Sequence, residues 1–454
     1  MVRGREVSVT ATVPNVDALT QLVVGARTMN LPDEVLEAAK MCLVDWCGVA
    51  IGARNELANL TTRRVVDNWK TQGNARILLG GTVAPGAAAL INGTLAHCLD
   101  YDDTHVGSLA HLSGPIWATV GALGTHRHLD EHLMLQAFVT GFETGAWLGG
   151  GGMGEALNRR GWHSTGVFGC IGAVSAASVM LGLDERQTRN AFAVAATQTG
   201  GVTGSFGTMS KPFHAGKAAF NAILAAELAA QGFEARVDLL EPGGELARTL
   251  VQDASSTFPS VETFASWEIL NNTFKPYASC LLTHPVIDAA RRMSDRIKPE
   301  SIERVSITVN SACGQLAGKT NPSTSLEGKF STAFCAALGL TGCRAQEEDF
   351  QDARLYETVI RNLVARTTLH VDDTLDLRAA VLKVKTFLGE EFQENTILAL
   401  GNPGNPMSWK DMQDKFEALV RPALGLRADE LYDCLRNFGS AGSLGQFDLL
   451  VAAN

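Results

Sequence analysis

The apolar positions in the first half of the chain follow the periodicity of helices. Segments 15–23 and 32–49 place an apolar residue every three or four positions, and Pro32 stands where the first turn of a helix tolerates proline. The same pattern predicts helices at about 85–97, 115–125, 131–148, 166–182, 185–198 and 214–231. Many of these segments are apolar on every side, which indicates helices buried against other helices.

The pattern changes after about residue 265. The segments "ERVSITVNS" (303–311), "TTLHVDD" (367–373) and "VLKVKTF" (381–387) alternate apolar and polar residues, as half-buried strands do. Helical segments lie between them, which indicates a smaller α+β domain. After "GNPGNP" (401–406), Ser408 and Asp411 form a capping-box pattern that begins a helical C-terminal part. This part either forms a tail or returns to the first domain.

The expected fold class is therefore mainly α. We expect a large all-helical domain of residues 1–265, completed by residues 405–454, and a smaller α+β domain of residues 266–404. Residues 166–183 carry no charge and could be mistaken for a membrane span. Their many Gly, Ala and Ser residues favour a closely packed core helix instead, so we expect no membrane partner.

Composition narrows the class of protein. The 454-residue chain has 46% apolar and 19% charged residues, which is typical of a compact globule, and its formal net charge is −10. That charge disfavours nucleic acid and anionic membranes as partners. The nine cysteines are scattered without a CxxC pair, which favours reduced thiols and offers no zinc framework. Such thiols are typical of a cytoplasmic protein, and the first fifteen residues hold no apolar leader, so we expect a cytoplasmic location.

Titratable groups concentrate in "GTLAHCLDYDDTHVGSLAH" (93–111), between two apolar runs. The six groups are His97, Asp100, Asp102, Asp103, His105 and His111. A polar loop between helices needs caps and charges, and Asp serves both purposes. Such a loop does not need three imidazoles. A functional loop would use His as a base near neutral pH and Asp to fix its tautomer.

Further candidate groups lie in "RRGWHSTGVFG" (159–169) and "GSFGTMSKPFHAGKAAFNA" (204–222). His163 stands at the entry to the uncharged helix, where it is either a cap or a catalytic group. The second segment fails the GxxxxGK[ST] phosphate-loop pattern, because Ala218 follows Lys217. Lys211 stands near a probable helix start, where it either is solvated or holds a carboxylate together with backbone N–H groups.

Two more segments carry candidate groups. In "FKPYASCLLTHPVIDAA" (274–290), Tyr277 follows Lys275 closely and could donate a proton, although both could equally be structural at the domain junction. In "THRHLDEHL" (125–133), two His stand at i and i+4. The HExxH metal motif would need Glu at Leu129, which favours a surface turn over a metal site.

Four of these segments, taken in order, resemble the MmgE/PrpD superfamily, which includes 2-methylcitrate dehydratase, cis-aconitate decarboxylase and iminodisuccinate epimerase. The matching pieces are "NGTLAHCLDYDDTH", "GWHSTGVFGCIGAVSAAS", "FGTMSKPFHAGKAAFNAILAAELAAQGF" and "KPYASCLLTHPVIDAA". Weaker matches are "GKFSTAFCAAL" and "NPMSWKDMQDKF". The resemblance thus runs through nearly the whole chain.

The resemblance implies a large all-α domain completed by the C-terminal part, a smaller α+β lid domain, and a homodimer. It also implies a site between the domains that binds a small polycarboxylate without a metal or another cofactor. Carried over by motif, the catalytic residues would be Asp100, His111, His163 and Tyr277, and the substrate-binding residues Lys211, Lys275 and the nearby His105.

One position departs from the family pattern. The family usually has His-Pro-Ser where this chain has His111, Leu112 and Ser113, which frees the backbone next to His111.

The function expected from these residues is proton transfer at a carbon next to a carboxylate, in a lyase or an isomerase. Ammonium groups would stabilise the charge that builds on the carboxylate oxygens. A dehydratase, a decarboxylase and an iminodisuccinate-type epimerase all fit one residue set. "FGTMSKP" is somewhat similar to the epimerase and decarboxylase branches. The alternatives are a carboxylate-binding protein without catalysis and, less favoured, a metal-dependent hydrolase.

Overall fold

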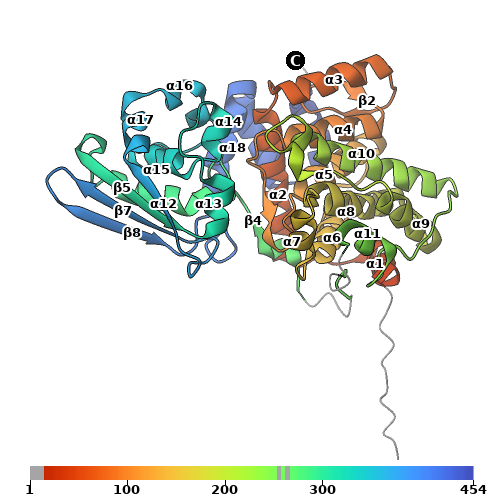
Figure 1. Cartoon of the computed structure of the whole chain (residues 1–454). Coiled ribbons are helices and arrows are strands. Elements are labelled where there is room, and N and C mark those ends of the chain that lie inside the picture. The colour runs from red at the N-terminus through yellow and green to blue at the C-terminus, as the bar shows by residue number, and fades with distance from the viewer. Residues whose placement is uncertain (1–14, 253–256, 261–265, 453–454) are drawn as a thin grey trace, which may run out of the picture.

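The chain folds into a large helical unit and a smaller unit that contains a four-stranded sheet (Figure 1). The computed structural model describes residues 15–252, 257–260 and 266–452. The mainly α fold class with a smaller α+β part is thereby confirmed. The segment used for the leader prediction lies almost wholly outside the described residues, as does the predicted boundary at 265, and the domain limits stay a prediction.

The helices predicted from apolar spacing in the first half are present. The large unit contains α1 (Asn15–Gly25), α2 (Asp33–Gly52), α3 (Leu57–Trp69), α4 (Pro85–Ala96), α5 (Ser113–Arg127), α6 (Glu131–Gly149), α7 (Met153–Arg159), α8 (Ser164–Leu181), α9 (Glu185–Ala196), α10 (Ser210–Ala230) and α11 (Glu245–Val251). Two short strands, β1 (Ala75–Arg76) and β2 (Thr82–Val83), pair antiparallel between α3 and α4. The core lies where α8 packs against α6, α5 and α10.

Small residues let α8 approach its neighbours closely. A Cβ placed on Gly172 of α8 would lie 2.6 Å from the Gly141 carbonyl oxygen of α6, so any larger side chain there would separate the helices. Among the described residues, α8 alone is long and apolar enough to span a membrane, and 94% of it is buried inside the protein. It is therefore the core helix of the large unit, as its Gly, Ala and Ser content predicts.

The smaller unit is built on one mixed sheet in the order β6-β5-β7-β8. Its strands are β5 (Ile302–Val309), β6 (Thr367–Val371), β7 (Ala380–Thr386) and β8 (Glu391–Thr396), and its helices are α12 (His284–Ser294), α13 (Ser311–Ala317), α14 (Ser325–Lys329), α15 (Thr332–Leu340), α16 (Asp352–Leu355) and α17 (Thr358–Ala365). β5 pairs parallel with β6 and antiparallel with β7. Alternate residues of β5 and β7 are buried, as period-two spacing predicts.

The C-terminal helices α18 (Trp409–Leu424), α19 (Arg427–Arg436) and α20 (Ser443–Leu450) return to the large unit, where α18 packs on α2 and α20 contacts α5. The predicted capping box of Ser408 and Asp411 begins α18. Within α18, Lys415 is buried, its Nζ lies 2.5 Å from Asp45 Oδ1 of α2, and it donates to the Tyr101 carbonyl oxygen at 2.8 Å. The C-terminal part thus fixes the loop that follows α4.

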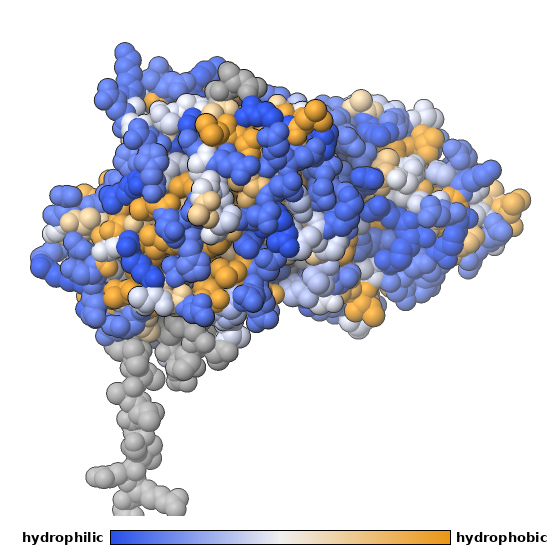
Figure 2. Space-filling view, turned by 180° about the vertical axis from the view of Figure 1, so that it is seen from behind, coloured by the Kyte–Doolittle hydropathy of each residue, from blue (hydrophilic) through white to orange (hydrophobic). Residues whose placement is uncertain are grey.

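The surface differs between the two units. Figure 2 shows the molecule from behind, where hydrophobic residues gather over the large helical unit while hydrophilic residues cover most of the smaller unit. Exposed apolar side chains of the large unit include Leu57, Val65, Trp69 and Phe213 on α3 and α10.

Replacing Lys415 by Met is expected to destabilise the fold by about 3–5 kcal/mol, because it leaves the carboxylate of Asp45 buried without its partner. Chemical denaturation monitored by circular dichroism measures this change. The double variant Lys415→Met with Asp45→Asn removes both charges and should recover part of the loss. A single variant as stable as the wild type would show that the pair does not hold the C-terminal part.

Candidate active site

The loop between α4 and α5 is tied to the segment that joins the two units. Its strand β3 (Thr104–His105) pairs antiparallel with β4 (Asn272–Thr273). The Tyr101 hydroxyl donates to the Pro276 carbonyl oxygen at 2.8 Å. The titratable loop therefore lies next to the segment that carries Lys275, although about 175 residues separate them in sequence.

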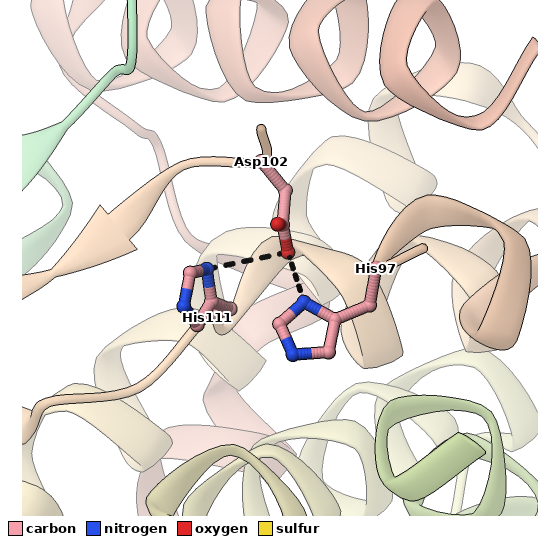
Figure 3. A group of neighbouring side chains, drawn as sticks. All are labelled: His97, Asp102 and His111. Carbon is pink, nitrogen blue, oxygen red and sulfur yellow. Dashed lines mark hydrogen bonds and ion pairs between the residues drawn. The ribbon is translucent and has the colours of Figure 1, made fainter. Parts of the chain in front are cut away.

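Asp102 contacts two histidines of the loop between α4 and α5. Its Oδ2 lies 2.8 Å from His97 Nδ1 and 3.3 Å from His111 Nδ1, so one carboxylate oxygen faces two imidazoles (Figure 3). His97 and Asp102 are buried, and the His111 side chain is 13% exposed. An ionised carboxylate only accepts hydrogen bonds, so both rings donate Nδ1–H and keep Nε2 as a base.

The row of imidazoles continues beyond Asp102. The ring of His97 lies 4.6 Å from that of His111 and stacks on that of His163 at 5.5 Å, centroid to centroid. His163 Nδ1 in turn lies 3.0 Å from His214 Nδ1 of α10. His163 stands at the N-cap of α8, but its side chain makes no capping hydrogen bond. Its ring therefore belongs to a cluster formed by His97, His111, His163 and His214, which we call the imidazole cluster.

Burial holds two of these rings neutral. Desolvation lowers the pKa of His97 to about 4, although the charge of Asp102 partly opposes it. Desolvation, with further contributions from His97 and Lys211, also places the pKa of His163 well below its usual value. Burial alone would raise the pKa of Asp102, but His111 and His97 hold it well below its usual value. At neutral pH the rings of His97 and His163 are thus neutral, while the carboxylate of Asp102 is ionised.

Asp100 forms a second charged centre. The Lys211 ammonium of α10 bonds its Oδ1, and Lys275 Nζ lies 3.5 Å from the same oxygen and donates to the Asp100 carbonyl oxygen at 2.6 Å. Burial would raise the pKa of Asp100, yet Lys211, Lys275 and His111 lower it far below its usual value. Two ammonium groups beside one carboxylate leave a net positive charge, which can bind an anionic ligand.

The backbone of Asp100 supports this placement. It adopts a φ of 54°. This left-handed conformation is open to Asp at lower cost than to most residues.

A cavity of about 250 Å³ opens at this centre, between the two units. Its wall includes His97, Asp100 and Lys211 of the large unit and Lys329 and Glu347 of the smaller unit. Such a volume suits a small metabolite rather than a large ligand. His111, His163 and Lys275 are not part of this wall, but each contacts a residue that lines it.

The other two expected site residues have different surroundings. His105 bonds Ser108 Oγ at 2.9 Å and Glu268 Oε2 at 3.1 Å through its two ring nitrogens. The Tyr277 hydroxyl donates to Asp288 Oδ1, and burial, followed by Asp288, raises the pKa of this phenol. In the described residues their partners are not members of the imidazole cluster. Their assigned roles stay predictions.

Leu112 adopts a backbone conformation that a proline could also adopt. Its φ is −78°, within the range that a proline ring imposes, and it precedes α5 directly. Its side chain is fully buried. The backbone next to His111 therefore does not need the proline to adopt this conformation.

Sequence reasoning assigned no role to His97, Asp102 or His214. His97 and Asp102 belong to the titratable run, and their arrangement depends on a turn that spacing does not specify. His97, Asp102 and His111 also form a group that could hold a metal ion, with ligand atoms within 4.8 Å of one another. The Nδ1–carboxylate contacts of 2.8 and 3.3 Å suit hydrogen bonds, and a metal would have to replace both protons. The expected metal-free site stays a prediction.

Comparison with known sequences agrees with the resemblance. The MmgE/PrpD N-terminal domain matches residues 17–258, and the MmgE/PrpD C-terminal domain matches residues 277–436. The chain belongs to the MmgE/PrpD family. Both matches include candidate residues, since Asp102 and Lys211 fall in the first and Tyr277 and Lys329 in the second.

Known relatives of this MmgE/PrpD chain share about a quarter of its residues. The cis-aconitate decarboxylase of Homo sapiens is 24% identical over 87% of this chain and 85% of that protein. That of Aspergillus terreus is 27% identical over 72% of each chain. A cis-aconitate decarboxylase-like protein of Aspergillus oryzae is 26% identical over 77% of this chain and 78% of its own.

The neutral state of His97 is directly measurable. Because burial lowers its pKa to about 4, His97 should stay neutral when the pH falls from 7 to 5, with its proton on Nδ1. Nitrogen NMR of the histidine-labelled protein separates the two tautomers and the doubly protonated ring. Protonation of both His97 nitrogens near pH 6 would contradict this description of the site.

Proposed function

We propose that this protein is a lyase that decarboxylates a small unsaturated tricarboxylate of the cis-aconitate type, without a cofactor. The observation that carries the proposal is the convergence of Lys211 and Lys275 on Asp100, beside the imidazoles arranged around Asp102. Family membership and the relatives named above support a lyase of this kind. The expected homodimer and cytoplasmic location stay predictions.

The reaction needs charge stabilisation and a proton. When the carboxylate on the CH₂ carbon of cis-aconitate leaves as CO₂, its bonding electrons form a new double bond to the central carbon. The former double-bond electrons move to the CH carbon, whose own carboxylate takes up the negative charge. A proton added to this carbon completes a methylene-substituted dicarboxylate. The substrate thus loses CO₂ and gains one proton.

The residues of the site match these two needs. Lys211 and Lys275 would bind carboxylates of the substrate, including the one on which negative charge builds, and preplaced cations stabilise such charge strongly. His111 or His163 would deliver the proton to carbon. Asp102 would stabilise the imidazolium that His111 forms while it holds that proton. Tyr277 stays in the hypothesis as a general acid. Its hydroxyl now donates to Asp288, so it would have to exchange this partner for the substrate.

The same groups would serve a dehydratase or an iminodisuccinate-type epimerase, because each reaction forms a carbanion next to a carboxylate. Purified protein incubated with cis-aconitate, 2-methylcitrate or iminodisuccinate separates the reactions by product. We expect turnover of cis-aconitate. Exclusive turnover of another compound would replace the decarboxylase assignment, and binding without any turnover would favour a carboxylate-binding protein.

Two variants test the residue roles on the true substrate. Lys211→Ala should lower kcat/KM by about 10²–10³-fold, because one preplaced cation is lost. His163→Ala should lower kcat by about 10²–10⁴-fold with less effect on KM, because a proton-transfer group is lost. Lys217→Ala, a change on the same helix α10 and outside the cluster, serves as the control. Turnover that survives both site variants would show that the roles are wrong.

A further inference from the structure

The smaller unit contributes a lysine of its own to the cavity wall. Lys329 ends α14, is buried, and lines the same cavity as Asp100 and Lys211. Its Nζ donates to the Leu99 carbonyl oxygen at 3.0 Å and lies 2.7 Å from Glu347 Oε2. An ammonium group has three N–H donors, and these contacts use two of them. Lys329 is therefore a buried cation beside the proposed substrate.

Glu347 is the counter-charge of this lysine. It also lines the cavity, and its side chain is 25% exposed where that of Lys329 is 7% exposed. A buried ammonium needs an anionic partner, but that partner need not be the same one when a ligand enters. The more exposed carboxylate can turn away while the lysine stays bonded to Leu99. A ligand carboxylate could then take its place.

We propose that Lys329 binds a carboxylate of the substrate, so that this chain prefers tricarboxylates over dicarboxylates. The inference rests on the proposed function, because it assigns a subsite of the same cavity. With Lys329, the site offers one ammonium group for each of three carboxylates, the others being Lys211 and Lys275. Because Leu99 precedes Asp100, a ligand on Lys329 also links the smaller unit to the loop that carries the second charged centre.

A purely structural role for Lys329 makes a different prediction. If the lysine only joined the two units through Leu99 and Glu347, its loss would weaken every ligand alike. If it binds a third carboxylate, its loss weakens only ligands that have one. Ligands that differ by a single carboxylate therefore distinguish the two roles.

The experiment is calorimetric binding to the full-length protein. Tricarballylate has three carboxylates and no double bond to react, and glutarate and 2-methylsuccinate each lack one of its carboxylates. Lys329→Met should weaken tricarballylate binding by about 10- to 100-fold and change glutarate and methylsuccinate binding less than twofold. Lys329→Arg should recover part of the affinity. Glu347→Gln should strengthen tricarballylate binding, because a competing anion is removed.

Lys319→Met is the matched control, since Lys319 pairs with Glu327 in the smaller unit and its side chain is 45% exposed outside the cavity. The proposal is overturned if the wild type does not prefer tricarballylate, or if Lys329→Met weakens all three ligands equally or none. If Lys329→Met turns over cis-aconitate with an unchanged KM, the subsite is ruled out but the proposed function stands. Selective binding of tricarballylate without turnover of cis-aconitate would keep the subsite and contradict the proposed function.

Discussion

The candidate site depends on one buried carboxylate. Asp102 lies in the interior of the helical unit, where an ionised group is costly unless several donors compensate it. Two imidazoles supply that compensation and are themselves oriented by it. Because the carboxylate fixes their Nδ1–H tautomers, their Nε2 atoms become bases in fixed positions. The acid–base character of the cluster thus follows from the need to satisfy a buried charge.

The rest of the fold holds the loop that carries this carboxylate. β3 pairs with β4 at the junction of the units, and the buried pair of Lys415 and Asp45 joins α18 and α2 behind the loop. Lys415 also bonds the carbonyl oxygen of Tyr101, the residue before Asp102. A segment near the C-terminus therefore positions a segment near residue 100. The cavity in front of the loop then receives one wall from each unit.

How far the sequence predicts this protein depends on the range of the interaction. Helices such as α2 and α6 and strands such as β5 follow from local periodicity, and the capping box before α18 is a local signal too. Alternation does not predict β8, because it is a polar edge strand in which all but one residue is partly or fully exposed.

The site residues also divide into those that the sequence predicts and those that only the folded chain brings together. Motif resemblance points to Asp100, Lys211 and Lys275, which the structure does bring together. The contacts of Asp102 with both His97 and His111 require a turn between these two histidines, which residue spacing alone does not specify. The meeting of Lys329 with Leu99 joins positions 230 residues apart, so only the folded chain reveals it.

The central claim is that the charge of Asp102 drives proton transfer to a carbon next to a carboxylate, and one comparison tests it. Asp102→Asn keeps an oxygen acceptor and removes the charge. The neighbouring Asp103 is the control, because it is buried as Asp102 is but accepts from Ser113 and Asn272 instead of contacting the imidazoles. The reaction is followed in D₂O as the rate at which one deuterium enters the product carbon.

We predict a loss of about 10²–10⁴-fold for Asp102→Asn and little loss for Asp103→Asn. A product without solvent deuterium, or an Asp102→Asn variant as fast as the wild type, would contradict the account.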